Sequence, residues 1–386
     1  MKKILIYTIK NGQFIDSLYH ALGKGFNEIG RDVVYCYINE QNFIENLLKL
    51  INSEDIDFSI GHNEFGIINA NQYDFLKKFY TSREHVSILD DAPYNIVTYK
   101  ISDIVCPNLL LAYRDRSHYE YLKSISMHYK VLDYFFLPFG ALIDKRDDFT
   151  ENKDIDVIFS GMYYGEAERA WHDHEIEKAL VSFLDHIANI LEVEAITVDD
   201  AVSRTMKDYK LKIDKDFFYP AYGILYQYCK MYRRNKLIET MVNSNIQLTV
   251  CSETWKKSIF ADKLRYEIAN NTQDILNLYR RSKVLLHDMA EFNDGSHCRI
   301  GDGTLCNTFI VTEHSKFLKE HFHDSELMFF QWNKLKNLHK TISILCNQYS
   351  MLNSFRDSAY KKVCDNFLPK HSAMKILDAI TMTRNS

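Results

Sequence analysis

The sequence lacks an apolar stretch long enough to cross a membrane. Its longest apolar runs, such as Tyr134–Ile143, fall far short of the roughly 20 residues that a spanning helix needs. The N-terminal MKKILIYTIKNGQF begins with basic residues, as a signal peptide does. However, its apolar run is short, is interrupted by Lys10 and has no small-residue cleavage site, so a buried first strand explains it better. We therefore expect a cytoplasmic protein, soluble or at most in peripheral contact with a membrane.

The sequence also lacks paired cysteines and an excess of either charge. The 8 cysteines include no C-x-x-C pair, and several lie in predicted strands, which indicates reduced and mostly buried thiols. The formal net charge is only -5, so no strong field attracts nucleic acid, and we expect no nucleic-acid partner. Hydrophobic residues make up 46% and charged residues 26% of the chain, which is typical of a folded globular protein. A length of 386 residues favours two domains.

Short apolar runs alternate with amphipathic stretches in residues 1–143. Strands are predicted at KILIYT, VVYCYI, DFSI, VSIL, DIVC and YFFLP, which begin at Lys3, Val33, Asp57, Val86, Asp103 and Tyr134. Helices are predicted between the first four of them. Continuous apolar strands separated by helices indicate a parallel sheet buried on both faces, so residues 1–143 are predicted to be one α/β domain.

A charged stretch without apolar periodicity, residues 144–154, is the predicted linker to a second α/β domain over residues 155–345. Its strands are IDVIFS, IQLTVC, KVLLH, TFIVT and LMFF, and residues 166–242 form a helical insertion after the first of these. Residues 346–386 are predicted to be a C-terminal helical tail. Ligands of open α/β sheets bind at the carboxyl ends of strands, so the chemistry is expected in the loops that follow the strands.

The most informative segment is FNDGSHCRIGDGTLCNTFIVTE, residues 292–313, in which a polar loop leads into a short helix. Asp294 and Asp302 lie eight positions apart, so one carboxylate can lie in the loop and the other on the helix. Helix-start N–H groups around Ser296–Arg299, together with the Arg299 guanidinium, suit a diphosphate. Asp302 can accept hydrogen bonds from both hydroxyls of a ribose. A solvated loop with ordinary helix caps is the alternative interpretation.

This segment resembles the donor-binding segment of GT-B glycosyltransferases, in particular the CgeB-like, spore-maturation-type family. Ser296, Arg299, Asp302 and Cys306 occupy places in that family's pattern. Asp294 and Asp302 are also similar to the paired glutamates of retaining GT-B enzymes. Aspartate replaces glutamate at both positions, and Asn307 stands where the family usually has glycine. Asparagine tolerates the left-handed conformation that such a helix end requires.

The resemblance implies a GT-B fold, in which two Rossmann-like domains have parallel sheets that face each other across a cleft. It also implies a glycosyltransferase of hexosyltransferase type, which moves a sugar from a nucleotide-diphosphate sugar to a hydroxyl of a glycan, lipid-linked or protein acceptor. GT-B enzymes generally need no bound metal, and the histidines at 172–174 and 321–323 lack a third ligand at useful spacing, so neither a metal nor a cofactor is expected. A nucleotide-sugar 2-epimerase of the same fold, or a non-catalytic nucleotide-sugar-binding scaffold, is the alternative.

Further donor-binding candidates in the second domain are Gly161, Lys256 and His297. Gly161 would let a phosphate approach the backbone, and Lys256 and His297 would contact the diphosphate. A tight turn, a surface lysine and a capping histidine explain the same residues. In the first domain, His62, Asp90 and Asp91 follow strands and are the candidates for the base that deprotonates the acceptor hydroxyl. Turns and helix caps are again the alternative.

Overall fold

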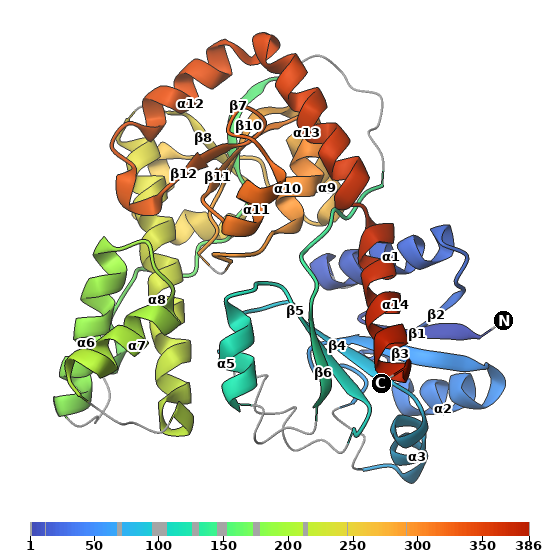
Figure 1. The fold of residues 1–386 in the computed structure, drawn as a ribbon. Coiled ribbons are helices and arrows are strands. Elements are labelled where there is room, and N and C mark those ends of the chain that lie inside the picture. Colours follow the sequence, from blue (N-terminus) through green and yellow to red (C-terminus); the bar gives the residue numbers. More distant parts are fainter. Residues whose placement is uncertain are drawn as a thin grey trace. The chain divides into compact units, whose positions relative to one another are not determined.

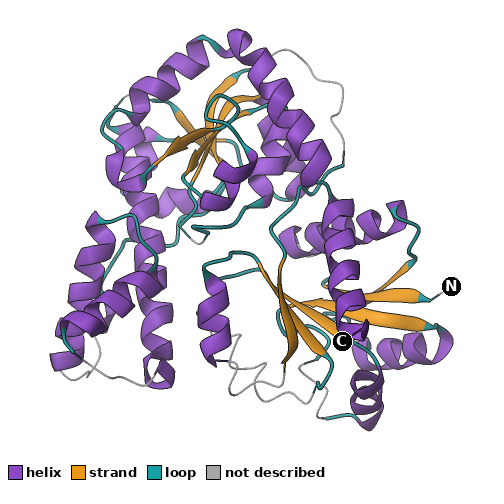
Figure 2. Cartoon of the chain, viewed as in Figure 1, coloured by secondary structure: helices purple, strands orange, loops and turns teal. Residues whose placement is uncertain are grey.

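The computed structural model describes residues 2–11, 13–67, 72–94, 106–125, 131–144, 153–172, 178–210, 215–244, 246–290 and 292–385. The chain divides into two compact units (Figures 1 and 2). Unit 1 comprises Met1–Lys145, Asp294–Gly301 and Val363–Ser386, and unit 2 comprises Arg146–Asn293 and Asp302–Lys362. Among the described residues, none of the helices combines the length and the apolar character needed to span a membrane.

Unit 1 is built around a parallel six-stranded sheet in the order β2-β1-β3-β4-β5-β6. Its strands are β1 (Lys3–Thr8), β2 (Val33–Tyr37), β3 (Ile56–His62), β4 (His85–Leu89), β5 (Leu109–Tyr113) and β6 (Val131–Phe136). Its helices are α1 (Gln13–Glu28), α2 (Phe43–Ser53), α3 (Asp74–Ser82), α5 (His118–Ile125) and α14 (Pro369–Asn385). The central strands are nearly continuous apolar runs because both faces of a parallel sheet are covered.

The C-terminal helix α14 packs against α1 within unit 1. A Cβ atom at Gly25 would lie only 2.4 Å from the carbonyl carbon of Pro369, so the missing side chain lets the two helices approach closely. Near its other end, Arg384 donates hydrogen bonds to Glu84 (2.8 and 2.7 Å) and to Asp57 (3.1 Å). The last helix of the chain is therefore part of the cover of the first sheet.

Unit 2 contains a second parallel six-stranded sheet, in the order β12-β11-β10-β7-β8-β9. Its strands are β7 (Ile155–Phe159), β8 (Leu248–Val250), β9 (Arg265–Tyr266), β10 (Ser282–His287), β11 (Phe309–Glu313) and β12 (Met328–Phe330). Its α-helices are α6 (Lys178–Val193), α7 (Val198–Asp208), α8 (Lys215–Val242), α9 (Thr272–Arg281), α11 (Lys316–His321) and α12 (Leu338–Asn347). Helix α13 (Asn353–Asn366) begins in unit 2 and ends in the Val363–Ser386 segment of unit 1. Short 3-10 helices are η2 (Ala170–His172), η3 (Glu253–Lys257), η4 (Ala261–Lys263), η5 (Trp332–Lys334) and η6 (Tyr349–Leu352). Helix α10 (Cys298–Leu305) begins in the Asp294–Gly301 segment of unit 1 and ends in unit 2.

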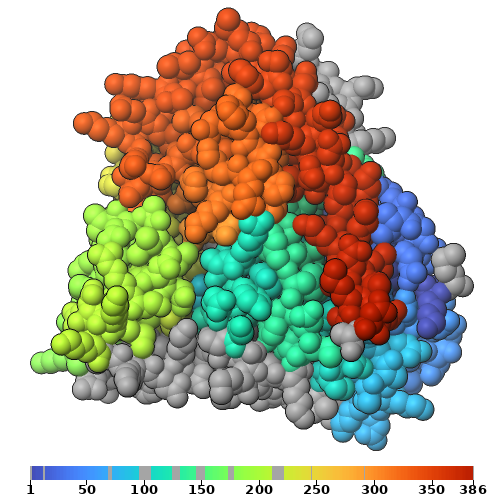
Figure 3. Space-filling view, in the orientation of Figure 1, coloured from blue at the N-terminus to red at the C-terminus, as the bar shows by residue number. Residues whose placement is uncertain are grey.

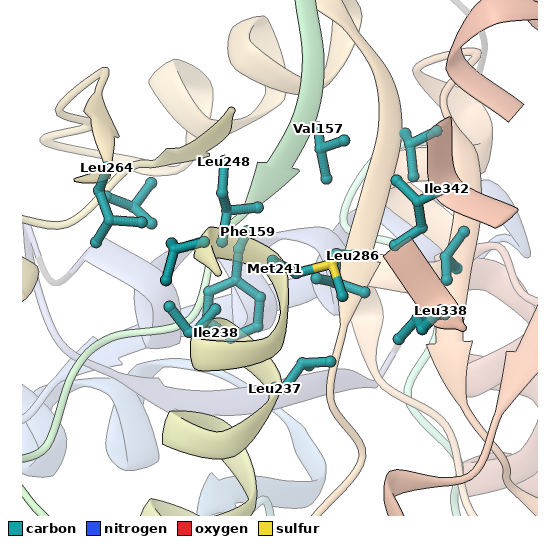
Figure 4. Packing of buried hydrophobic residues seen from close by; sticks show 14 of the residues in the cluster. Val157, Phe159, Leu237, Ile238, Met241, Leu248, Leu264, Leu286, Leu338 and Ile342 are labelled. Carbon is teal, nitrogen blue, oxygen red and sulfur yellow. The ribbon is translucent and has the colours of Figure 1, made fainter. Parts of the chain in front are cut away.

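The core of unit 2 joins the helical insertion to the sheet (Figure 4). Leu237, Ile238 and Met241 of α8 have the spacing of one helix face and are buried against Phe159 of β7 and Leu286 of β10. The C-terminal half of α8 is therefore a core helix, whereas α6 and α7 form a yellow-green surface in Figure 3. At the base of the insertion, Arg233 Nη2 donates to the backbone oxygens of Glu194 (3.1 Å) and Ile196 (3.0 Å).

The predicted α/β organisation, with two parallel sheets, is confirmed, but individual strands differ from prediction. The sequence pattern predicts a strand at DIVC, whereas the strand found after β4 is β5, Leu109–Tyr113. Of the DIVC residues, Asp103–Val105 lie outside the described residues and Cys106 is not in a strand. Two apolar runs follow each other closely here, and periodicity alone cannot choose between them. Most of the predicted linker, residues 145–152, also lies outside the described residues.

A buried histidine lies at the start of β4 in unit 1. His85 is fully buried, and its Nδ1 is 2.9 Å from Ser59 Oγ. Among the described residues, its Nε2 has no hydrogen-bond partner. Burial lowers the pKa of His85 to about 3, because the charged imidazolium would lose its hydration without gaining a partner. The folded unit therefore holds this ring in its neutral form.

We predict that His85 makes the protein sensitive to mild acid. Below the ordinary histidine pKa of about 6.5, the unfolded chain binds a proton that the folded chain excludes. The stability contributed by the neutral ring is thus complete above this pH and is lost as the pH falls, by about 1.4 kcal/mol per pH unit. Denaturant unfolding between pH 7 and pH 5 should show a shallower pH dependence for His85→Gln than for wild type, and an unchanged dependence for the exposed control His323→Gln. Equal slopes for wild type and His85→Gln would contradict the prediction.

Candidate functional site

The strand order of unit 2 reverses between β7 and β10, and polar residues gather where these strands end. Such a reversal leaves a crevice outside the carboxyl ends of the strands, and open α/β sheets bind ligands there. Gly161 and Met162 lie just after β7, and Asp288 lies just after β10. Arg234 of α8 links the two strand ends, because its Nε donates to Asp288 Oδ2 (2.9 Å) and its Nη1 donates to the Met162 oxygen (2.8 Å).

A second buried ion pair lies beside the first. Arg233 Nη1 is 3.8 Å from an oxygen of Glu313, the last residue of β11, and both side chains are buried. Burial raises the pKa of Glu313, and the Arg233 charge and the Met289 N–H offset only part of this rise. The four charged residues Arg233, Arg234, Asp288 and Glu313 are absent from the sequence-based site. They could have been noticed as an Arg-Arg pair on a helix and as carboxylates that end or follow apolar strands.

Gly161 and Lys256, both predicted to bind the donor, differ in their surroundings. A Cβ atom at Gly161 would lie 2.7 Å from the Phe159 ring, and the Gly161 oxygen accepts a hydrogen bond from Trp255 Nε1 (2.7 Å). Packing alone therefore requires glycine at this position. Lys256 lies on η3 after β8, is exposed, and forms an ion pair with Glu253 (2.8 Å). Both residues stay predictions as donor contacts.

Asp294 and Asp302 lie where their spacing predicts, the first in a loop and the second on α10. Asp302 is buried, with 3% of its surface exposed, and is therefore not a surface cap. The helix ends at a left-handed residue, because Asn307 has a φ of 56° and the following Thr308 N–H donates to the Gly303 oxygen (2.9 Å). The expectation that asparagine can replace glycine at this turn is thus confirmed.

The loop before α10 is held by residues that follow β5 in unit 1. The Asp294 N–H donates to Asp115 Oδ2 (2.7 Å), and Gly295 forms an antiparallel bridge with Asp115. The Asp294 carboxylate also lies 3.7 Å from Arg116 Nη1. A Cβ atom at Gly295 would lie 2.3 Å from the Arg114 oxygen, so only glycine allows this approach. Asp115 therefore fixes the start of the predicted donor loop.

His297 caps the start of α10. Its Nδ1 accepts hydrogen bonds from the Arg299 N–H (3.2 Å) and from the Cys298 thiol (3.3 Å), and its ring lies against those of Phe14 and Phe139. The Arg299 amide, one of those expected to meet a diphosphate, is therefore already hydrogen-bonded within the turn. Ser296 is buried. The described residues contain no group of three or more possible metal ligands, and His174 lies outside them.

In unit 1, polar residues from three neighbouring strands meet at one carboxylate. His62 ends β3, Asp90 follows β4 and Arg114 follows β5. Asp90 Oδ2 accepts hydrogen bonds from His62 Nδ1 (2.7 Å) and Tyr19 Oη (3.0 Å). Asp90 Oδ1 accepts from Arg114 Nε (2.8 Å) and Nη2 (2.6 Å). The sequence predicts His62 and Asp90 as candidate bases but does not identify Arg114.

These hydrogen-bond donors stabilise the ionised form of Asp90. Burial would raise its pKa, but the charge of Arg114 and the hydrogen bond from His62 outweigh burial, so the pKa of Asp90 is lowered. Because His62 Nδ1 donates to Asp90, its Nε2 accepts a hydrogen bond from Asn63 Nδ2 (3.0 Å). Asp91 is exposed beside this cluster. The three candidate bases thus lie together, in three different environments.

Comparisons with known proteins agree with this architecture. Residues 233–378 match the model of the family described as glycosyl transferase-like. A search of curated proteins found no match. Among solved structures, the chain is similar to sucrose-phosphate synthase from Thermosynechococcus elongatus (8% identity, 99% of each chain covered, TM-score 0.54). It is also similar to a glycosyltransferase from Rickettsia africae (10% identity, 99% and 98% covered, TM-score 0.52).

A third similar structure is HepE from Anabaena, solved in complex with UDP-glucose (8% identity, 99% of this chain and 100% of that chain covered, TM-score 0.53). At such low identity these likenesses define the fold, and in each case they span essentially the whole chain. They agree with the two parallel sheets and with the family match over α8 to α14. The chain therefore has the GT-B fold, and its residues 233–378 match the glycosyl transferase-like family.

Proposed function

We propose that the protein is a glycosyltransferase that moves a sugar from a nucleotide-diphosphate sugar to an acceptor hydroxyl. One observation carries this proposal: the match to the glycosyl transferase-like family, residues 233–378, includes Arg234, Asp288 and the whole segment from Asp294 to Asp302. HepE, which has the same fold, was solved with UDP-glucose, and this supports a nucleotide sugar as the donor. The finer resemblance to CgeB-like enzymes and a hexosyl group as the transferred sugar belong to the same proposal.

The donor would be held by the loop and helix around α10. Asp302 would accept hydrogen bonds from the ribose hydroxyls, and Arg299 would donate to the diphosphate. As the bond between the sugar and the diphosphate breaks, negative charge grows on the leaving diphosphate. The positive end of the α10 dipole and the guanidinium would stabilise that charge without a metal ion. Gly161, Lys256, Asp294, Ser296 and His297 are further proposed donor contacts.

The acceptor hydroxyl would lose its proton to His62. Asp90 is a poor base because four donor groups hold its charge. A neutral His62 with a proton on Nδ1 has a lone pair on Nε2, which accepts from Asn63 Nδ2 (3.0 Å) and would exchange this amide for the acceptor hydroxyl. In this arrangement Asp90 would orient the imidazole and stabilise its protonated form. Asp91 is the competing candidate. The acceptor oxygen then bonds to the sugar carbon that the diphosphate leaves.

We predict that Asp302→Asn weakens nucleotide binding while the fold is retained. The substitution removes the charge of a buried side chain but keeps its shape, so it is a cleaner test than alanine. A hydrogen bond to a charged group contributes about 1.5 to 3 kcal/mol, so the loss of one such bond corresponds to a loss of affinity of about 10- to 150-fold. Calorimetric titration with UDP and other nucleoside diphosphates, with and without a chelator, measures this effect. Asp208→Asn, an exposed change in α7, is the control.

A stable Asp302→Asn variant that binds nucleotides as tightly as wild type would remove Asp302 from the donor site. Loss of all nucleotide binding in chelator would overturn the proposal that no metal is needed. Incubation of the wild-type protein with donor alone tests the activity itself. A transferase hydrolyses the donor slowly at most, whereas conversion to an epimeric sugar nucleotide would identify an epimerase.

We predict that His62→Asn lowers the transfer rate about 10²- to 10⁴-fold and leaves nucleotide affinity nearly unchanged. The asparagine amide can still donate to Asp90, so this buried carboxylate keeps a partner and the fold is preserved. Asp91→Ala is the matched comparison, because Asp91 is the adjacent candidate. A rate that falls for Asp91→Ala but not for His62→Asn would assign the base to Asp91. An equal fall in affinity and rate for His62→Asn would place His62 at the donor instead.

A further inference from the structure

A pocket of about 420 Å³ lies along the edge of the unit 2 sheet, at β12. Its walls come from β12 and Gln331, from residues around α11, and from the segment that enters α12. The lining residues used below are His314, Lys319, Phe329, Lys334, Asn337 and Thr341. In the sheet, β12 is two strand positions from β10, which Asp288 follows, or about 10 Å at the usual spacing, and neither Arg234 nor Asp288 lines this pocket.

The surroundings of the pocket are basic in a protein whose net charge is negative. Between His314 and Thr341 the chain has five lysines and three acidic residues. One of the three, Glu326, is buried and already paired with Lys362 (2.6 Å). Lys319 and Lys334 contribute the cationic groups of the lining, and Asp324, paired with Lys319, is the acidic residue in it. An ammonium group has three donors, so Lys319 can bind an anion while it keeps this partner.

One wall of the pocket is the aromatic ring of Phe329, which contacts the ammonium group of Lys319 and the imidazole of His314. Lys319 Nζ lies 4.7 Å from the centre of the Phe329 ring, and the His314 ring packs edge-on against the same ring at 6.3 Å. Burial lowers the pKa of His314, the charges of Lys319 and Lys316 lower it further, and Asp324 partly opposes them. The neutral form of His314 is therefore favoured, and a bound anion would raise the pKa of this ring by offsetting the lysine charges. Gln331, Asn337 and Thr341 add neutral polar groups to the lining.

These features favour a small ligand over an added peptide strand. The edge strand β12 has only three residues, and the Phe330 oxygen is directed to β11, where it accepts from the His314 N–H (2.8 Å). Too few outward backbone groups remain for strand addition by an extended peptide. The pocket volume lies instead in the range of small-molecule sites, which combine apolar walls with a few polar groups.

We propose that the β12 pocket binds a phosphorylated small molecule of about monosaccharide size. Lys319, Lys334 and His314 hold the phosphate, Asn337, Gln331 and Thr341 hydrogen-bond to hydroxyl groups, and Phe329 packs against the carbon skeleton. The site does not depend on the glycosyltransferase proposal, and its occupant is a second ligand in addition to any nucleotide sugar.

Glucose 6-phosphate is a suitable probe, with unphosphorylated glucose and inorganic phosphate as the comparison ligands. Calorimetric titration of the whole protein should show saturable binding of glucose 6-phosphate, competition by inorganic phosphate, and no binding of glucose. The double variant Lys319→Ala/Lys334→Ala should lose affinity by about tenfold or more. Lys361→Ala, an exposed change on α13, should bind as wild type does. NMR of the His314 ring should show a pKa rise on addition of the probe.

Three outcomes would overturn the proposal. These are the absence of saturable binding of glucose 6-phosphate at about 10 mM, unchanged affinity in the double variant, and binding of an acidic polyglutamate peptide in place of the phosphorylated sugar. The double variant should retain wild-type affinity for UDP. Loss of glucose 6-phosphate binding with UDP binding intact therefore tests this pocket separately from the proposed donor site.

Discussion

Both sheets of the protein are parallel throughout, and this constraint decides where polar chemistry can lie. Parallel strands all end at the same edge of their sheet, and both faces are covered by helices, so buried strands leave room for polar groups mainly at that edge. In unit 1 the edge gathers His62, Asp90 and Arg114 from three adjacent strands. In unit 2 the reversal of strand order places Asp288 beside the backbone that follows β7.

The two edges use the same device, a buried guanidinium bound to a carboxylate by two hydrogen bonds. Arg114 holds Asp90 in unit 1, and Arg234 holds Asp288 in unit 2. Burying such pairs costs hydration that their attraction only partly returns, and removal of one partner leaves an uncompensated charge. Such ion pairs therefore contribute little net stability, but they fix the positions of the side chains and backbone that they bind. This fits a role in orienting groups such as His62 and the loop after β7 for the proposed reaction.

The predictable part of the fold and site follows from local patterns. Apolar periodicity identifies most strands, and the eight-position spacing of Asp294 and Asp302 correctly predicts one loop and one helical carboxylate. The short strand β9 and the choice of β5 over DIVC depend on tertiary pairing that local patterns do not encode. Arg114, Arg234 and Asp115 belong to the site only through partners far away in the sequence. Charged residues are usually exposed, so a sequence pattern predicts them at the surface. Burial beside a partner that is distant in the sequence cannot be predicted from the adjacent residues.

Unit 1 is assembled from three separated segments, and this has a consequence for the order in which the protein can form. Its sheet and most of its helices are translated first, before any of unit 2. The Asp294–Gly301 loop, which Asp115 binds, is synthesised only after most of unit 2. Helix α14, which packs against α1 at Gly25, is synthesised only after all of unit 2. Until then the Gly25 face of α1 and the acidic pair Asp57 and Glu84 lack the partners that α14 supplies. During synthesis the first unit therefore remains incompletely covered until α14 packs against it. Partly folded states of this kind are the ones that chaperones bind.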